Sequence, residues 1–184
     1  GNSKNVLRAA VAAREMGLLL AARGYGVVYG GGGVGLMKVL ADAVLESHGH
    51  VIGVIPQALV ERELAHHGLP ELRVVGSMHE RKAVMADLAD GFIALPGGLG
   101  TIEEFFEVWT WAQLGIHNKP CGLLNVEDYY REIVGFVDHA VDEGFLDPVH
   151  RASLIVEAQP SALIDSFERF APPQVTRWLK REEA

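Results

Sequence analysis

The chain has 184 residues, of which 49% are hydrophobic and 22% are charged, and its formal net charge is −8. This is the balance of a globular protein with one sizeable core, and the negative charge argues against a nucleic-acid backbone as a partner. No apolar run approaches the roughly 20 residues that cross a bilayer, so we expect no membrane partner either.

Short apolar runs alternate with helical patterns along almost the whole chain. Helices are predicted at 5–23, 34–47, 78–89, 101–114, 129–143 and 161–170, and strands at 26–29, 50–55, 72–75, 92–95, 121–124 and 153–156. Apolar strands separated by helices are typical of a parallel sheet that is covered on both faces. The pattern therefore predicts an α/β fold, a Rossmann-like doubly wound parallel sheet with helices on both faces.

We expect one domain, 1–184, because no repeat or low-complexity linker interrupts the pattern. A doubly wound fold normally begins with a central strand, whereas this chain opens directly on a helix. We therefore expect an upstream first strand in the natural protein that this sequence does not include. The single cysteine, Cys121, lies in an apolar stretch, which favours a buried thiol in a reducing, cytoplasmic compartment.

A run of glycines, Gly30 to Gly33, follows the strand 26–29 and precedes a helix. Such a position suits a loop that approaches a phosphate or a ribose closely, through Gly31, Gly32 and Gly33. A tight turn that needs a positive φ would also explain glycine here, although four glycines exceed what one turn requires.

The second glycine-rich turn, Pro96 to Gly100, comes directly after the strand 92–95. A turn with so few side chains leaves bare N–H groups at the start of the next helix, where phosphates bind. We expect the first turn of that helix to carry a hydroxyl, Thr101, and two acids, Glu103 and Glu104. Part of this charge complements the helix dipole, but two acids beside an anion-binding loop also indicate chemistry on a phosphate-bearing substrate. Only one of the two can point squarely into the site, because neighbours on a helix differ by about 100°.

Two cations, Arg81 and Lys82, are expected in the first turn of the helix 78–89, where the helix dipole disfavours them. Ser77 can cap this helix, and Glu80 can complete a capping box, but neither explains the cations. We expect an anionic partner for them, either an acid of the second glycine-rich turn or a substrate phosphate, with a solvated pair as the alternative.

The eight histidines form no convincing metal set, so no metal is predicted, and the pair His66-His67 is expected in a solvated loop. Aromatic residues crowd the helix 101–114. They are expected in the core, at a subunit interface or along a pocket for a base.

Three stretches together resemble one family, the LOG ("Lonely guy") cytokinin riboside 5′-monophosphate phosphoribohydrolases. They are Tyr-Gly-Gly-Gly-Gly-Val-Gly-Leu-Met at 29–37, Met-His-Glu-Arg-Lys at 78–82 and Pro-Gly-Gly-Leu-Gly-Thr-Ile-Glu-Glu at 96–104. Lys38 departs from the pattern, because the family usually has glycine there. Members of this family were long labelled lysine decarboxylases, but this sequence shows no recognisable setting for a pyridoxal–lysine.

The resemblance implies hydrolysis of the N-glycosidic bond of an N6-substituted AMP, which gives the free base and ribose 5-phosphate. It implies that Arg81 and Glu104 form the catalytic pair and that no cofactor is needed. It also implies a homodimer with the active site near the subunit interface. Contacts with the nucleotide 5′-monophosphate are expected from Glu63, Lys82, Thr110 and the motif residues Gly97, Gly98, Leu99, Gly100, Thr101, Ile102 and Glu103.

The chemistry of these two side chains fits such a cleavage. A carboxylate can stabilise an oxocarbenium-like state and orient or deprotonate a water molecule. A guanidinium is a poor proton donor but a good clamp for a phosphate or a carboxylate, so we expect Arg81 to position rather than to protonate. Two alternatives remain open: a broader purine or pyrimidine 5′-monophosphate nucleosidase, and a carrier that binds a nucleotide or cofactor without turnover.

Overall fold

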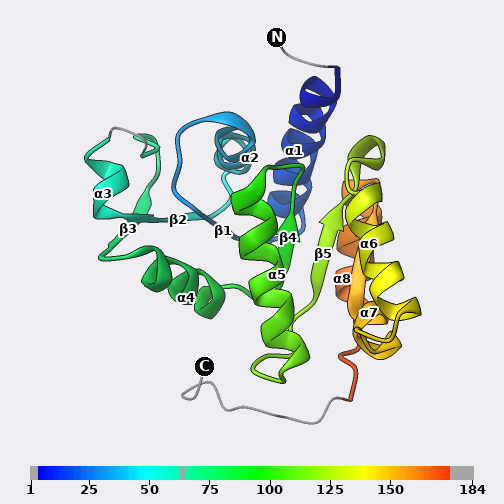
Figure 1. Ribbon diagram of the computed structural model, residues 1–184. Helices are drawn as coiled ribbons and strands as arrows, with labels where there is room; N and C mark the ends of the chain where they lie inside the picture. Colours follow the sequence, from blue (N-terminus) through cyan, green and yellow to red (C-terminus); the bar gives the residue numbers. More distant parts are fainter. Residues whose placement is uncertain (1–3, 63–64, 175–184) are drawn as a thin grey trace. The chain divides into compact units, whose positions relative to one another are not determined.

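The computed structural model describes residues 4–62 and 65–174. Contacts within the chain divide it into two compact units, Gly1–Ala89 and Asp90–Ala184. Each unit contains a three-stranded parallel sheet and its own helices (Figure 1). The expectation of a single domain stays a prediction.

The sheet of the first unit is built from strands in the order β1-β2-β3. These are β1 (Val27–Tyr29), β2 (Val51–Pro56) and β3 (Glu71–Val75). β2 is the middle strand and all six of its residues are buried, as its continuous apolar sequence predicts.

Helices cover both faces of this sheet. They are α1 (Lys4–Ala22), α2 (Gly35–Glu46), the short α3 (Gln57–Val60) and α4 (Met78–Leu88). Val51 packs on the side of α2 with Ala41 and Val44, whereas Ile52 faces the opposite side with Val84 of α4. This alternation follows from the two-residue period of a strand.

The sheet of the second unit has the order β4-β5-β6 and is also parallel. Its strands are β4 (Phe92–Ala94), β5 (Cys121–Leu124) and β6 (Leu154–Glu157). Its helices are α5 (Leu99–Gln113), the 3-10 turn η1 (Val126–Asp128), α6 (Arg131–Asp142), α7 (Pro148–Ser153) and α8 (Pro160–Glu168).

α8 covers one face of this second sheet, since a Cβ on Gly122 of β5 would lie 2.6 Å from the Phe167 ring. The other face carries the main core, in which Leu123 packs with Phe105 and Trp109 of α5. Both parallel sheets are therefore covered on both faces, which confirms the predicted α/β class.

The aromatic residues of α5 are used mainly within their own unit. Phe105 and Trp109 are buried in the core, and the half-buried Phe106 and Trp111 pack against it. Phe106 stands edge-on to Trp109, with ring centroids 5.7 Å apart. The interpretation of these residues as core is confirmed for Phe105 and Trp109.

No helix in the described part of the chain is long and apolar enough to cross a membrane.

Candidate functional site

The Pro-Gly-Gly turn is shorter than predicted, because α5 begins at Leu99 and not at residue 101. Gly98 is the N-cap residue, with an extended backbone (φ −92°, ψ −155°) and no side chain to cap the helix. The first α-helical hydrogen bond runs from the Ile102 N–H to the Gly98 carbonyl, over 3.2 Å. The N–H groups of Leu99, Gly100 and Thr101 therefore have no acceptor within the helix, as at the start of any α-helix.

This start of α5 corrects one expectation. Thr101 lies in the first turn as predicted, but Glu103 and Glu104 lie in the second turn, and the first turn has no acid. The helix dipole acts on charges mainly within the first turn. Complementing the dipole therefore explains the two acids less well than the sequence suggests.

The two acids differ in exposure, as their spacing around the helix requires. Glu103 is exposed and Glu104 is half-buried. Thr110 is also exposed and lies two turns from Glu103 on the same face of α5. Ile102 is half-buried and packs against the core, so its side chain helps to hold the helix start in place.

Two tyrosines that the sequence analysis missed as site residues hold the Pro-Gly-Gly turn. The Tyr129 hydroxyl donates to the Gly97 carbonyl over 2.6 Å, and the Tyr130 hydroxyl donates to the Leu95 carbonyl over 2.5 Å. The only signal in the sequence is the Tyr-Tyr pair ahead of helix α6, and nothing in it reveals a contact 32 residues away.

The glycine run of the first unit is packed against protein. Gly31 has a φ of +68°, and a Cβ on it would lie 3.1 Å from Ile55. A Cβ on Gly33 would lie 3.0 Å from the Ala65 carbonyl, and Gly32 forms an antiparallel bridge with Ala65. These contacts account for glycine at positions 31 and 33, while substrate binding by Gly31, Gly32 and Gly33 stays a prediction.

Arg81 lies in the first turn of α4 and is only 9% exposed. Its guanidinium packs against Gly30, and its Nη1 donates to the Met78 sulfur over 3.6 Å. The predicted cap of this helix is confirmed, because Ser77 accepts from the Glu80 N–H over 3.1 Å. The Glu80 carboxylate reaches back to the Gly76 N–H, one residue before the N-cap.

His66 is buried, not solvated as expected, and it is the one buried histidine among the described residues. Its Nδ1 accepts from the Gly68 N–H over 3.0 Å, so Nε2 carries the hydrogen and donates to Asp42 over 2.9 Å. Its backbone N–H donates to the Gly31 carbonyl. His66 thus ties the glycine run to helix α2.

Asp42 is shared between two partners. Lys38, one turn earlier on α2, donates to its second carboxylate oxygen over 2.5 Å. The hydrogen bond from Lys38 is the largest of the effects that lower the pKa of Asp42, and His66 adds to it. Lys38, the residue that departs from the family pattern, is therefore held in place by Asp42.

The predicted site residues divide between the two units. Gly31, Gly32, Gly33, Arg81 and the half-buried Lys82 belong to the first. Gly97 to Glu104 and Thr110 belong to the second. Glu63 lies outside the described residues.

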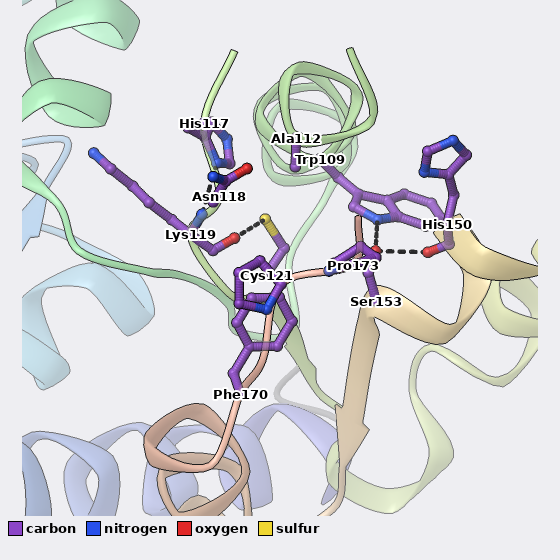
Figure 2. A pocket seen from close by; sticks show the side chains of 11 residues that line it. Trp109, Ala112, His117, Asn118, Lys119, Cys121, His150, Ser153, Phe170 and Pro173 are labelled. Carbon is purple, nitrogen blue, oxygen red and sulfur yellow. Dashed lines mark hydrogen bonds between the residues drawn. The ribbon is translucent and has the colours of Figure 1, made fainter. Parts of the chain in front are cut away.

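A pocket in the second unit lies beside Cys121, at the amino end of β5 (Figure 2). The indole of Trp109 donates to the Ser153 hydroxyl over 3.3 Å, and that hydroxyl donates to the His150 carbonyl over 2.6 Å. Burial raises the pKa of the Cys121 thiol to about 12, so the sulfur is protonated and inert, as predicted for a buried thiol. The Pro-Gly-Gly turn follows the carboxyl end of the parallel strand β4, so this pocket is at the opposite edge of the sheet.

The described residues contain no group of three or more histidine, cysteine or acidic side chains that could hold a metal ion.

Comparison with known proteins identifies the family. Residues 37–167 match a family described as "Possible lysine decarboxylase". The chain is 56% identical over 145 residues to the cytokinin riboside 5′-monophosphate phosphoribohydrolase of Rhodococcoides fascians, covering 78% of this chain and 73% of that protein. It is 52% identical over 163 residues to the probable cytokinin riboside 5′-monophosphate phosphoribohydrolase LOGL5 of Oryza sativa subsp. japonica, covering 89% of this chain. The chain spans 66% of the length of that rice relative.

A solved structure confirms the fold. The molybdenum cofactor binding protein from the phototrophic bacterium Rippkaea orientalis has a TM-score of 0.69 to this chain, and the likeness covers 92% of this chain and 91% of that one. At 19% identity this likeness concerns the fold alone. The family match and the identities of 52% and 56% show more: the chain belongs to the LOG family, whose model carries the older description of possible lysine decarboxylases.

Proposed function

We propose that this protein hydrolyses the N-glycosidic bond of cytokinin riboside 5′-monophosphates, which are N6-substituted AMP molecules. Water adds to C1′ of the ribose, the bond from C1′ to the base nitrogen breaks, and the base leaves with a proton. The products are the free base and ribose 5-phosphate. The names of the relatives at 52% and 56% identity support this activity.

The observation that carries the proposal is the arrangement along α5. An uncapped helix start at Gly98 suits a phosphate, and Glu104 follows in the second turn of the same helix. Glu104 comes five residues after Leu99, which is roughly 7.5 Å along the helix axis. The phosphate and the sugar ring of one ribose 5-phosphate can therefore both be met by this one rigid element.

In this proposal Glu104 stabilises the positive charge that develops at C1′ and orients or deprotonates the attacking water. Arg81 is permanently charged and already held by packing against Gly30, so it acts as the clamp for the phosphate or for Glu104. Nucleotide contacts come from Glu63, Lys82, Thr110, the glycines at 31–33 and the motif residues 97–103.

The active protein is proposed to be a homodimer of single-domain chains in the cytoplasm. The family resemblance supports the dimer, while the aromatic side of α5 supports it less than expected, because Phe105 and Trp109 are used in the core. The single, buried Cys121 supports a reducing compartment.

Product analysis tests the activity. The purified chain is incubated with N6-isopentenyl-AMP, with AMP and with the unphosphorylated N6-isopentenyl riboside, and the released base is measured by chromatography. Release from the first substrate alone supports the proposal. Equal release from AMP would indicate a broader nucleosidase, and binding of all nucleotides without release would indicate a carrier.

A further inference from the structure

Two neighbouring tyrosines, Tyr129 and Tyr130, act together on the Pro-Gly-Gly turn, and we call them the tyrosine clamp. Their hydroxyls donate to the carbonyls of Gly97 and Leu95, at 2.6 Å and 2.5 Å. The clamp thus grips the turn at two carbonyls on either side of Pro96. All of these groups belong to the second unit.

The chain positions the clamp through an unusual turn after strand β5. Glu127 and Asp128 are consecutive non-glycine residues with positive φ, 51° and 56°. Asn125 anchors this turn, because its N–H donates to the Glu157 carbonyl over 2.8 Å and its side-chain oxygen accepts from the Tyr130 N–H over 2.7 Å. Such backbone conformations persist only where the surrounding structure holds them, and they concentrate at functional sites.

The two tyrosines differ in burial. Tyr130 is 1% exposed and belongs to the core with Phe105 and Trp109, so it connects the turn to the packed interior. Burial also raises the pKa of Tyr130 far above its usual range, which keeps its hydroxyl a donor. Tyr129 is 48% exposed and stands edge-on to Tyr130, with centroids 5.0 Å apart. Its hydrogen bond therefore adds little to the core but directly restrains Gly97.

The turn needs such restraint because Gly97 and Gly98 lack the side chains that would limit their backbone. Peptide carbonyls carry partial negative charge, so a carbonyl that rotated toward a bound phosphate would repel it. Hydrogen bonds from the clamp give the carbonyls of Leu95 and Gly97 fixed partners. The N–H groups at the start of α5 are then held ready for an anion without a reorganisation cost.

We propose that Tyr129 and Tyr130 are positioning residues, which fix the Pro-Gly-Gly turn so that the start of α5 binds the 5′-phosphate of the substrate. This inference rests on the proposed function, because it assumes that the turn binds a phosphate. It assigns no chemical step to either tyrosine.

The test compares Tyr129→Phe with wild type, since this change removes the hydroxyl and keeps the ring against Tyr130. The KM for N6-isopentenyl-AMP and the Kd for ribose 5-phosphate are expected to rise about 3- to 10-fold, the worth of one hydrogen bond. The kcat is expected to change by roughly twofold or less, because the grip on the phosphate is the same in the ground and transition states. The melting temperature should stay within about 2 °C, since Tyr129 is half exposed.

Tyr25→Phe serves as the matched control, because Tyr25 is an exposed tyrosine in the first unit. Hydrogen exchange at the Ile102 amide, which donates to the Gly98 carbonyl, supplies a readout that needs no turnover, and it should become faster in Tyr129→Phe but not in Tyr25→Phe. Tyr130→Phe should show the same shift in KM. If Tyr130→Phe does not fold, Tyr129→Phe alone tests the role of the clamp.

The inference is overturned if Tyr129→Phe matches Tyr25→Phe in KM, in ribose 5-phosphate affinity and in amide exchange. If wild type binds ribose 5-phosphate but releases no base, the proposed function fails. The affinity and exchange measurements then still test whether the tyrosine clamp positions the turn. A wild-type protein that neither binds ribose 5-phosphate nor releases base from N6-isopentenyl-AMP overturns both.

Discussion

The guanidinium of Arg81 occupies the space that a side chain at Gly30 would need. A Cβ on Gly30 would lie 2.9 Å from the Arg81 Cζ and would collide with its terminal nitrogen. Glycine at position 30 thus leaves room for the guanidinium in its present place, and a left-handed turn does not explain it, since its φ is not positive.

Gly30→Ala is expected to displace Arg81 and to lower kcat/KM by about 100-fold, the usual cost of misplacing a site group by about 1 Å. Arg81→Ala should cause a loss of at least this size in both binding and turnover. Gly135→Ala is the control, because a Cβ there meets nothing within 4 Å. Wild-type kcat/KM in Gly30→Ala would show that the position of Arg81 against Gly30 does not matter for the reaction.

Glu104→Gln is expected to lower kcat by about 10²- to 10⁴-fold while nucleotide affinity stays nearly unchanged. The amide keeps the shape of the side chain but can neither stabilise a developing cation nor take a proton from water. Single-turnover kinetics and isothermal titration of N6-isopentenyl-AMP measure the two effects separately. Glu103→Gln is the matched control and should be mild. If Glu103→Gln loses turnover and Glu104→Gln is mild, the catalytic carboxylate is Glu103 and not Glu104.

Tyr29→Phe is expected to stabilise the protein. The Tyr29 hydroxyl is buried and has no hydrogen-bond partner among the described residues. Burial, with a contribution from the Asp42 charge, raises its pKa to about 12. Removing an unsatisfied buried hydroxyl should gain about 1 kcal/mol, or roughly 2–4 °C in Tm by calorimetry. A lower Tm would mean that the hydroxyl has a partner that holds it in the folded protein.

Because of His117, the free energy of unfolding should fall as the pH drops below about 6.5, which is the ordinary pKa of a histidine side chain. Its Nε2 donates to the Val108 carbonyl over 2.8 Å and its Nδ1 accepts from the Lys119 N–H over 3.1 Å, so the ring is neutral. Burial lowers the pKa of His117, and the Lys119 charge lowers it further against the opposing effect of the Val108 carbonyl. The unfolded chain therefore takes up the proton first, and the stabilisation present above about pH 6.5 is lost as the pH falls through the folded pKa.

Melting temperatures between pH 8 and pH 5 test this, together with an NMR titration of the His117 ring. His117→Gln should flatten the decline, whereas His67→Gln, at an exposed loop position, should not. An NMR midpoint at or above 6.5 would contradict the prediction.

The strands could be predicted from the sequence because each is a short, mainly apolar run, although β3 (Glu71–Val75) contains the exposed Arg73. All six were found within one or two residues of their bounds, from β1 (Val27–Tyr29) to β6 (Leu154–Glu157). The short helices α3 (Gln57–Val60) and α7 (Pro148–Ser153) were missed, since four or six residues are too few to show a helical period. The early start of α5 was missed because glycine disfavours a helix interior, while the extended Gly98 makes an N-cap that needs no side chain.

The candidate site could be predicted only where its residues follow one another in the chain. The motif 96–104 was found for this reason, whereas the pair of His66 and Asp42 joins residues 24 positions apart. The sequence around His66 predicts a solvated loop residue, because it carries no sign of the helix that packs against this side chain. The contact of Tyr129 with Gly97 escaped for the same reason, since only folding brings them together.

Leu99, directly after the N-cap of α5, is 90% exposed. Because so little of its apolar surface is removed from water on folding, this side chain adds almost nothing to the folding free energy. Selection at this position is thus released from the usual compromise between stability and activity. A saturation library at codon 99 would therefore test the proposed contact of Leu99 with the substrate in a nearly constant thermodynamic background.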